Sequence, residues 1–126
     1  MQPVNLFDLA SQQARWLAVR QTAVSSNIAN ANTPGYAALD VVPFEAVLNQ
    51  SAVAMRATHA RHLGAADSGG GYSVRQTNDS VPVMPSGNTV TLETELMKSG
   101  EVRRGLEMNT AVVKAFHRML MMTTRG

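Results

Sequence analysis

Three histidines are the side chains best suited to chemistry, and two of them stand close together. His59 and His62 are three residues apart, so they would share one face if their segment is helical. Two imidazoles could bind a metal ion, but the chain has no cysteine and no clear carboxylate cluster to complete a site. We interpret the pair as solvated or bonded to backbone, and His117 as a packing or polar-edge residue. The sequence thus predicts no metal site and no cofactor.

Other motifs that could carry chemistry are incomplete. Ser, His and Asp occur in no arrangement that resembles a nucleophile elbow. The run Gly69–Gly71 lacks the Lys and Ser/Thr of a phosphate-binding loop and is typical of a linker. Asn78-Asp79-Ser80 matches a glycosylation sequon, but no secretory signal precedes it. The sequence predicts no catalytic residue, and an enzyme is the least favoured class.

Composition bounds the remaining classes. A chain of 126 residues is enough for one domain, and with 44% hydrophobic but only 5% aromatic residues its core must be built from Ala, Val, Leu and Met. A net charge of +2 with scattered arginines does not suggest nucleic-acid binding. No apolar run approaches the about 18–20 residues that span a bilayer, and the N-terminus has no basic and apolar signal pattern.

A long helix is predicted near the N-terminus, from about residue 5 to residue 31. Asn5 is a plausible N-cap, and Asp8 would lie near the positive end of the helix. A stripe of residues then recurs at alternating steps of three and four, as in a coiled coil. Its members are Phe7, Ala10, Ala14, Leu17, Gln21, Val24, Ile28 and Ala31. We expect this stripe to pack against another helix.

A second long helix is predicted from Thr91, as its N-cap, to the last few residues. Glu93 and Glu95 lie in its first turn, where acidic side chains are favoured. Gly100 and Gly105 weaken it and suggest a bend or a site of close packing. Its expected apolar face comprises Leu92, Leu96, Val102, Leu106, Asn109, Val113, Phe116 and Leu120, flanked by Val112, Met119 and Met122.

The middle of the chain is weakly patterned. Pro43 should start a short helical turn, and short strands are possible at residues 72–77 and 81–84. The predicted fold is mainly α: long N- and C-terminal helices paired as a coiled-coil-like bundle, with a short irregular, β-containing insert. It divides into residues 1–36, 37–88 and 89–126. Two helices have too little interior to bury both apolar faces, so we expect self-association.

An Asn-rich segment ends the first helix abruptly. Asn tolerates left-handed geometry and bonds nearby backbone, while Pro34 disfavours helix at the residue before it. We expect the asparagines to bond backbone of this or an adjacent chain, and the last three residues to set the exit turn. The predicted turn residues are Asn27, Asn30, Asn32, Pro34, Gly35 and Tyr36.

Read together, several segments resemble a known family. Ser26 to Tyr36 is similar to the signature of bacterial flagellar rod and hook proteins. The segments 40–48, 58–63 and 87–93 resemble those of the type B protein of the proximal rod, except that Ser86 stands where that type usually has Asp. The resemblance covers most of the chain and is weakest between residues 64 and 84. The short middle is also typical of this type, because distal rod and hook proteins carry larger middle domains.

The resemblance implies a structural subunit of the flagellar basal-body rod. Its expected partners are other copies of itself, neighbouring rod subunits, the ring-to-rod adapter protein and the flagellar type III export apparatus. It would leave the cytoplasm unfolded, without a cleaved signal, and assemble in the periplasm into a hollow drive shaft that transmits torque and conducts export substrates. A neighbouring small rod subunit type and a cytoplasmic helical adaptor or export chaperone are the alternatives.

The segment from Phe44 to Leu48 resembles the short Phe-x-x-x-apolar signal by which early rod and hook substrates are recognised for export. A single amphipathic turn docked on the core is the alternative interpretation, because such a pattern is common by chance. Both could hold at different stages, since the chain is exported unfolded.

Overall fold

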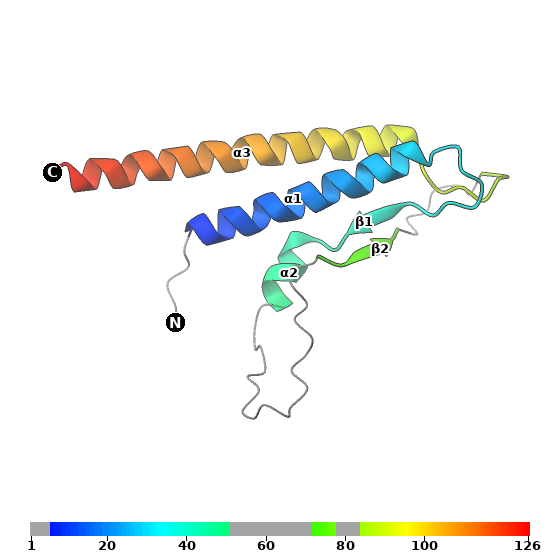
Figure 1. The fold of residues 1–126 in the computed structure, drawn as a ribbon, viewed down its shortest axis with the longest axis horizontal. Coiled ribbons are helices and arrows are strands. Elements are labelled where there is room, and N and C mark those ends of the chain that lie inside the picture. The colour runs from blue at the N-terminus through cyan, green and yellow to red at the C-terminus, as the bar shows by residue number, and fades with distance from the viewer. Residues whose placement is uncertain (1–5, 51–71, 78–83) are drawn as a thin grey trace, which may run out of the picture.

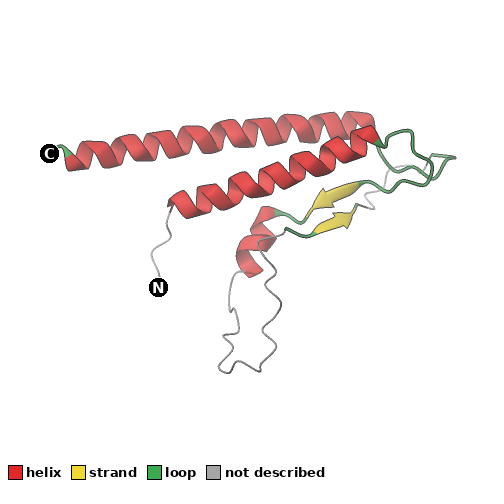
Figure 2. Ribbon diagram, viewed as in Figure 1, coloured by secondary structure: helices red, strands yellow, loops and turns green. Residues whose placement is uncertain are grey.

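The computed structural model describes residues 6–50, 72–77 and 84–126. Two long helices, α1 (Leu6–Ala29) and α3 (Leu92–Thr124), lie side by side (Figure 1). The insert between them holds strand β1 (Leu39–Val41), the short helix α2 (Phe44–Gln50) and strand β2 (Val74–Gln76), and it packs along α1 (Figure 2). The predicted fold class is confirmed: paired terminal helices with a small β-containing insert.

Contacts along the two helices show that they run antiparallel. As the residue number rises along α1, the number of its neighbour on α3 falls. Past Phe116, α3 continues beyond the start of α1, so its last two turns have no α1 residue beside them among the described residues. The contacts that define this register are Asn27–Glu95, Leu17–Gly105, Ala10–Asn109 and Phe7–Phe116.

The helix ends lie close to their predicted positions, with two differences. The predicted cap Asn5 lies outside the described residues, and α1 ends two residues before the predicted Ala31. Thr91 does precede α3 in an extended conformation, but its side chain makes no capping hydrogen bond. Its carbonyl instead accepts the N–H of Glu95 at 3.1 Å, so α3 begins through its backbone alone.

The described part of the insert is a two-stranded antiparallel ribbon, with the short helix α2 between its strands in the chain. Leu39 pairs with Gln76 and Val41 with Val74. β2 lies inside the predicted 72–77 strand, whereas β1 was not predicted. A strand of three residues is too short to show an alternation of apolar and polar side chains, and β1 pairs only with a strand far along the chain. Residues 81–83 lie outside the described part, and Met84 is not in a strand. α2 begins at Phe44, with the Pro43 carbonyl accepting two of its N–H groups.

The described core is narrow. Its buried apolar side chains come from α1, from the segment around β1, from the residue two before α3 and from α3 itself, and they are Ala10, Leu17, Ala23, Val24, Ala38, Val41, Val90 and Val102. Most of the large apolar residues of α3 are exposed instead. None of the described helices combines the length and apolarity that crossing a membrane requires.

Gly100 and Gly105 offer a matched test of close packing. A Cβ at Gly105 would lie 3.1 Å from Leu17 Cδ2 and 3.3 Å from Cδ1, whereas one at Gly100 would meet nothing within 4 Å. We expect Gly100→Ala to raise the free energy of unfolding by about 1 kcal/mol through helix propensity. Gly105→Ala should lose that gain or reverse it, because buried Leu17 must move.

Urea unfolding of the two variants beside the parent protein measures the difference. An equal gain from both substitutions would contradict the packing of Gly105 on Leu17.

Candidate assembly interface

The seam between α1 and α3 contains most of the predicted packing residues. Leu17 and Val24 are buried, and Val113 is half-buried. Phe7 meets Phe116 edge to face, with ring centroids 5.2 Å apart. The structure therefore brings these five together along one line of contact.

Three other predicted packing residues are not covered within the chain. Ile28, Leu106 and Leu120 are 36%, 38% and 42% exposed. Leu92 and Leu96, expected to begin the apolar face of α3, are exposed as well. In the first turn of α3 the covered position belongs to Glu95, so Leu92 and Leu96 lie outside the buried face.

An asparagine also crosses the seam. The side-chain amide of Asn109 donates to the Ala10 carbonyl at 2.9 Å and to Gln13 Oε1 at 3.1 Å. A half-buried polar contact of this kind helps to fix the register of two helices, because sliding either helix would leave the amide unbonded. The predicted polar member of the α3 stripe thus has a definite role in alignment.

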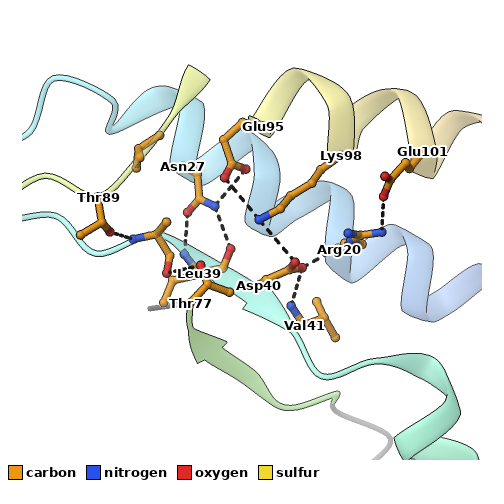
Figure 3. Close-up of polar contacts among 12 residues, drawn as sticks. Arg20, Asn27, Leu39, Asp40, Val41, Thr77, Thr89, Glu95, Lys98 and Glu101 are labelled. Carbon is orange, nitrogen blue, oxygen red and sulfur yellow. Dashed lines mark hydrogen bonds and ion pairs between the residues drawn. The ribbon is translucent and has the colours of Figure 1, made fainter. Parts of the chain in front are cut away.

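Asn27, from the predicted turn set, is a fully buried junction of three elements (Figure 3). Its Nδ2 donates to the Leu39 carbonyl at 2.7 Å and to Glu95 Oε2 at 3.1 Å. Its Oδ1 accepts the Leu39 N–H at 3.0 Å and the Tyr36 hydroxyl at 3.3 Å. One carboxamide thereby joins the end of α1 to β1 and to the first turn of α3.

A chain of alternating charges extends from this junction (Figure 3). Buried Glu95 lies 3.6 Å from Lys98 Nζ, which reaches Asp40 of β1 at 3.4 Å. Asp40 also meets Arg20 of α1 at 3.4 Å, and Arg20 reaches the exposed Glu101 at 3.2 Å. Because Glu95 has both an amide donor and an ammonium beside it, its burial leaves no unpaired charge.

Asn88 is a second buried asparagine that the sequence analysis did not single out. Its Nδ2 lies within 3.0 Å of the carbonyls of Asn30, Ala31 and Thr33, and its Oδ1 accepts the Val90 N–H at 2.7 Å. It satisfies carbonyls left open by the end of α1. Asn88 lies in the segment 87–93, which served above only for the family resemblance and was the one signal in the sequence that pointed to it.

The rest of the predicted turn set divides into bonded and exposed residues. Asn30 Nδ2 donates to the Ser26 carbonyl at 2.8 Å, closing the last turn of α1. Gly35 has a φ of +72°, which favours glycine, and donates its N–H to the Ser86 carbonyl at 2.9 Å. Asn32 and Pro34 are exposed. The expectation of backbone bonding is thus met within the chain by Asn27 and Asn30 but not by Asn32.

The two residues of the predicted export signal lie on α2. Phe44 is half-buried against Trp16 of α1, with ring centroids 5.8 Å apart, and Trp16 Nε1 donates to the Val42 carbonyl at 2.8 Å. Leu48 is 37% exposed. The folded chain therefore uses Phe44 as a packing residue, as the alternative interpretation expected.

Nothing in the described residues groups three or more side chains suited to a metal ion. His117 is exposed on α3, and His59 and His62 lie outside the described part. In the described residues, the polar side chains mainly join segments of the chain to one another.

Replacement of Asn27 tests its junction role, and Asn32 from the same turn provides the matched control. Asn27→Ala would leave the Leu39 N–H and carbonyl without their side-chain partner, and it would remove one of the two partners of the Tyr36 hydroxyl and of the Glu95 carboxylate. We expect it to lower the free energy of unfolding by about 3 kcal/mol. Asn32→Ala should change it by less than about 0.5 kcal/mol. Urea titrations followed by helical circular dichroism make the comparison, and equal effects would remove the junction role.

Comparison with known proteins identifies the family. A family model described as flagella basal body rod protein matches residues 10–36, which span most of α1 and the turn after it. The chain is 46% identical over 129 aligned positions to the flagellar basal body rod protein FlgB of Agrobacterium fabrum (strain C58). That alignment covers 99% of this chain and 96% of the relative. This chain therefore belongs to the family of flagellar basal body rod proteins.

Proposed function

We propose that this rod-family subunit builds the proximal rod, at the cell-proximal end of the flagellar basal body. Many copies and related subunits would join by heterologous contacts that do not close, and so form a helical tube. The tube would transmit torque and conduct later export substrates through its centre. The near-full-length similarity to a protein named FlgB supports the choice of type within the family.

One structural observation carries the assembly step: α3 leaves apolar side chains uncovered on both flanks of its seam with α1. Leu106 lies on one flank, Met108, Val112 and Met119 lie on the other, and Leu120 is exposed where α3 continues past the start of α1. An exposed apolar surface of this extent on a thin two-helix unit indicates that other subunits cover it. Two different flanks suit the unlike contacts of an open assembly.

The proposed partners follow from the family. They are other copies of this chain, neighbouring rod subunits, the ring-to-rod adapter protein and the flagellar type III export apparatus. The subunit would act in the periplasm after export without a cleaved signal. Residues 1–36 and 89–126 would form the inner rod domain, and residues 37–88 its outer insert.

Two alternatives remain distinct in what they require. A neighbouring small rod subunit type would share the fold and location but occupy a different position along the shaft. A cytoplasmic adaptor or export chaperone would stay inside the cell, and membership of a rod family argues against it.

Deletion of the gene tests the rod role. We expect a non-motile strain whose purified basal bodies, imaged by electron microscopy, have rings but no rod, and we expect the gene supplied in trans to restore both. Complete rods in the deletion strain would overturn the proposed function.

The proposed export role of Phe44 and Leu48 needs a test that separates recognition from folding. We expect Phe44→Ala and Leu48→Ala each to reduce secretion of the subunit at least several-fold, measured as secreted over cellular protein. Glu45→Ala, exposed on the same helix, should secrete normally.

Trp16→Ala is the control for folding. It removes the folded-state partner of Phe44 while leaving the segment 44–48 intact. Normal secretion of this variant beside poor secretion of Phe44→Ala would support recognition of the unfolded segment. Equal losses in both would instead assign the effect to the fold.

A further inference from the structure

An open groove runs along the side of α1 that faces away from α3. It has a volume of about 360 Å³ and lies between α1 and the ribbon. Its α1 wall includes Val19, Thr22 and Ser26, which lie about half a turn from the seam residue Leu17. The remaining lining residues are Ala23, Leu39 and Val74.

The groove offers an apolar surface with no free hydroxyl. The Thr22 hydroxyl donates to the Ala18 carbonyl at 3.1 Å, and the Ser26 hydroxyl lies 3.2 Å from that of Tyr36. The other lining side chains are aliphatic. A partner for this groove must therefore bring apolar side chains and gains nothing from polar ones.

A matching convex surface lies on the second half of α3. Met108, Val112, Ala115, Met119 and Met122 recur at steps of four, three, four and three, the spacing of a helix-packing seam. All five are exposed, the two end methionines by 70% and 64%. We call these five residues the methionine stripe. It lies roughly a quarter turn from the residues that face α1.

We infer that the methionine stripe of one copy lies in the α1 groove of the next copy. The two surfaces cannot meet within one chain, because α3 already occupies the opposite side of α1. Flexible methionines suit a shallow groove of small side chains. Each α1 would then lie between its own α3 and the α3 of a neighbour. Because the stripe and the groove are different surfaces, this contact can repeat from copy to copy without closing.

Charge argues against the symmetric alternative, in which two methionine stripes pair with each other. After Glu107, α3 carries Lys114, Arg118 and Arg125 and no acidic residue. Side-by-side pairing of two such halves would bring like charges together along the contact. The unlike contact avoids this, because α1 has a near-even balance of Asp8 against Arg15 and Arg20, the last already paired with Asp40.

The inference rests on the proposed self-assembly, and the chain is well suited to testing it because it contains no cysteine. Thr22→Cys places a thiol in the groove, and Met119→Cys places one on the methionine stripe. Mixed single-cysteine proteins, oxidised mildly, should give a disulfide-linked heterodimer at least ten times more readily than the matched controls. The controls are Ser25→Cys, on the side of α1 away from the groove, and Lys114→Cys, on the charged face of α3.

A second measurement uses variants without added thiols. Met119→Asp should weaken self-association at least ten-fold by analytical ultracentrifugation, whereas Lys114→Asp, which changes charge on the neighbouring face, should weaken it much less. Both residues are exposed in the single chain, so circular dichroism should be unchanged.

Preferential linking of Met119→Cys to itself, or a protein that stays monomeric up to millimolar concentration, would overturn the inference. The inference would also be overturned if the thiol of Thr22→Cys were protected from modification to the same extent after dilution, because the groove would then be occupied by a segment of the same chain. These outcomes leave the rod role intact if the deletion strain still lacks rods, so failure of the inference and failure of the function are distinguishable.

Discussion

The buried carboxamide of Asn27 is the contact on which the arrangement of this chain depends. It belongs to the last turns of α1, and it hydrogen-bonds to Leu39 of β1 and to Glu95 in the first turn of α3. Two helices alone bury too little apolar surface to define one geometry, so polar contacts with strict direction take over that task. Asn88 does the same for the turn, and Asn109 for the middle of the seam.

These polar contacts leave most of the large apolar residues of α3 uncovered. The polar junctions and a narrow line of Ala, Val and Leu hold the single subunit together, while the Leu and Met side chains of α3 remain at its surface. Such a subunit has a defined shape, but many of its apolar side chains are not buried. In the proposed assembly, helices of neighbouring subunits would complete this burial and so couple the stability of each copy to its place in the rod.

Much of the fold was predictable because its signals are local and repeated. A long stripe at steps of three and four predicted α1 and α3, and Asn, Pro and Gly in succession predicted where α1 stops. The positions of Asn27 and Asn30 in that turn were predicted for the same reason. β1 and Asn88 were missed, because a three-residue strand and a single asparagine acquire their meaning only from partners far along the chain.

The sequence by itself determined the helical class, the turn after α1 and the family resemblance, since these depend on residues close together in the chain. Only the tertiary structure decided which of the apolar residues of α3 are covered. It placed Glu95 inward, beside Asn27 and Lys98, and left Leu92 and Leu96 outside. An apolar stripe in the sequence shows roughly which face of a helix is covered, but not which of two adjacent residues on that face is buried. The choice between neighbours is made by directional bonds from another segment, which no local pattern records.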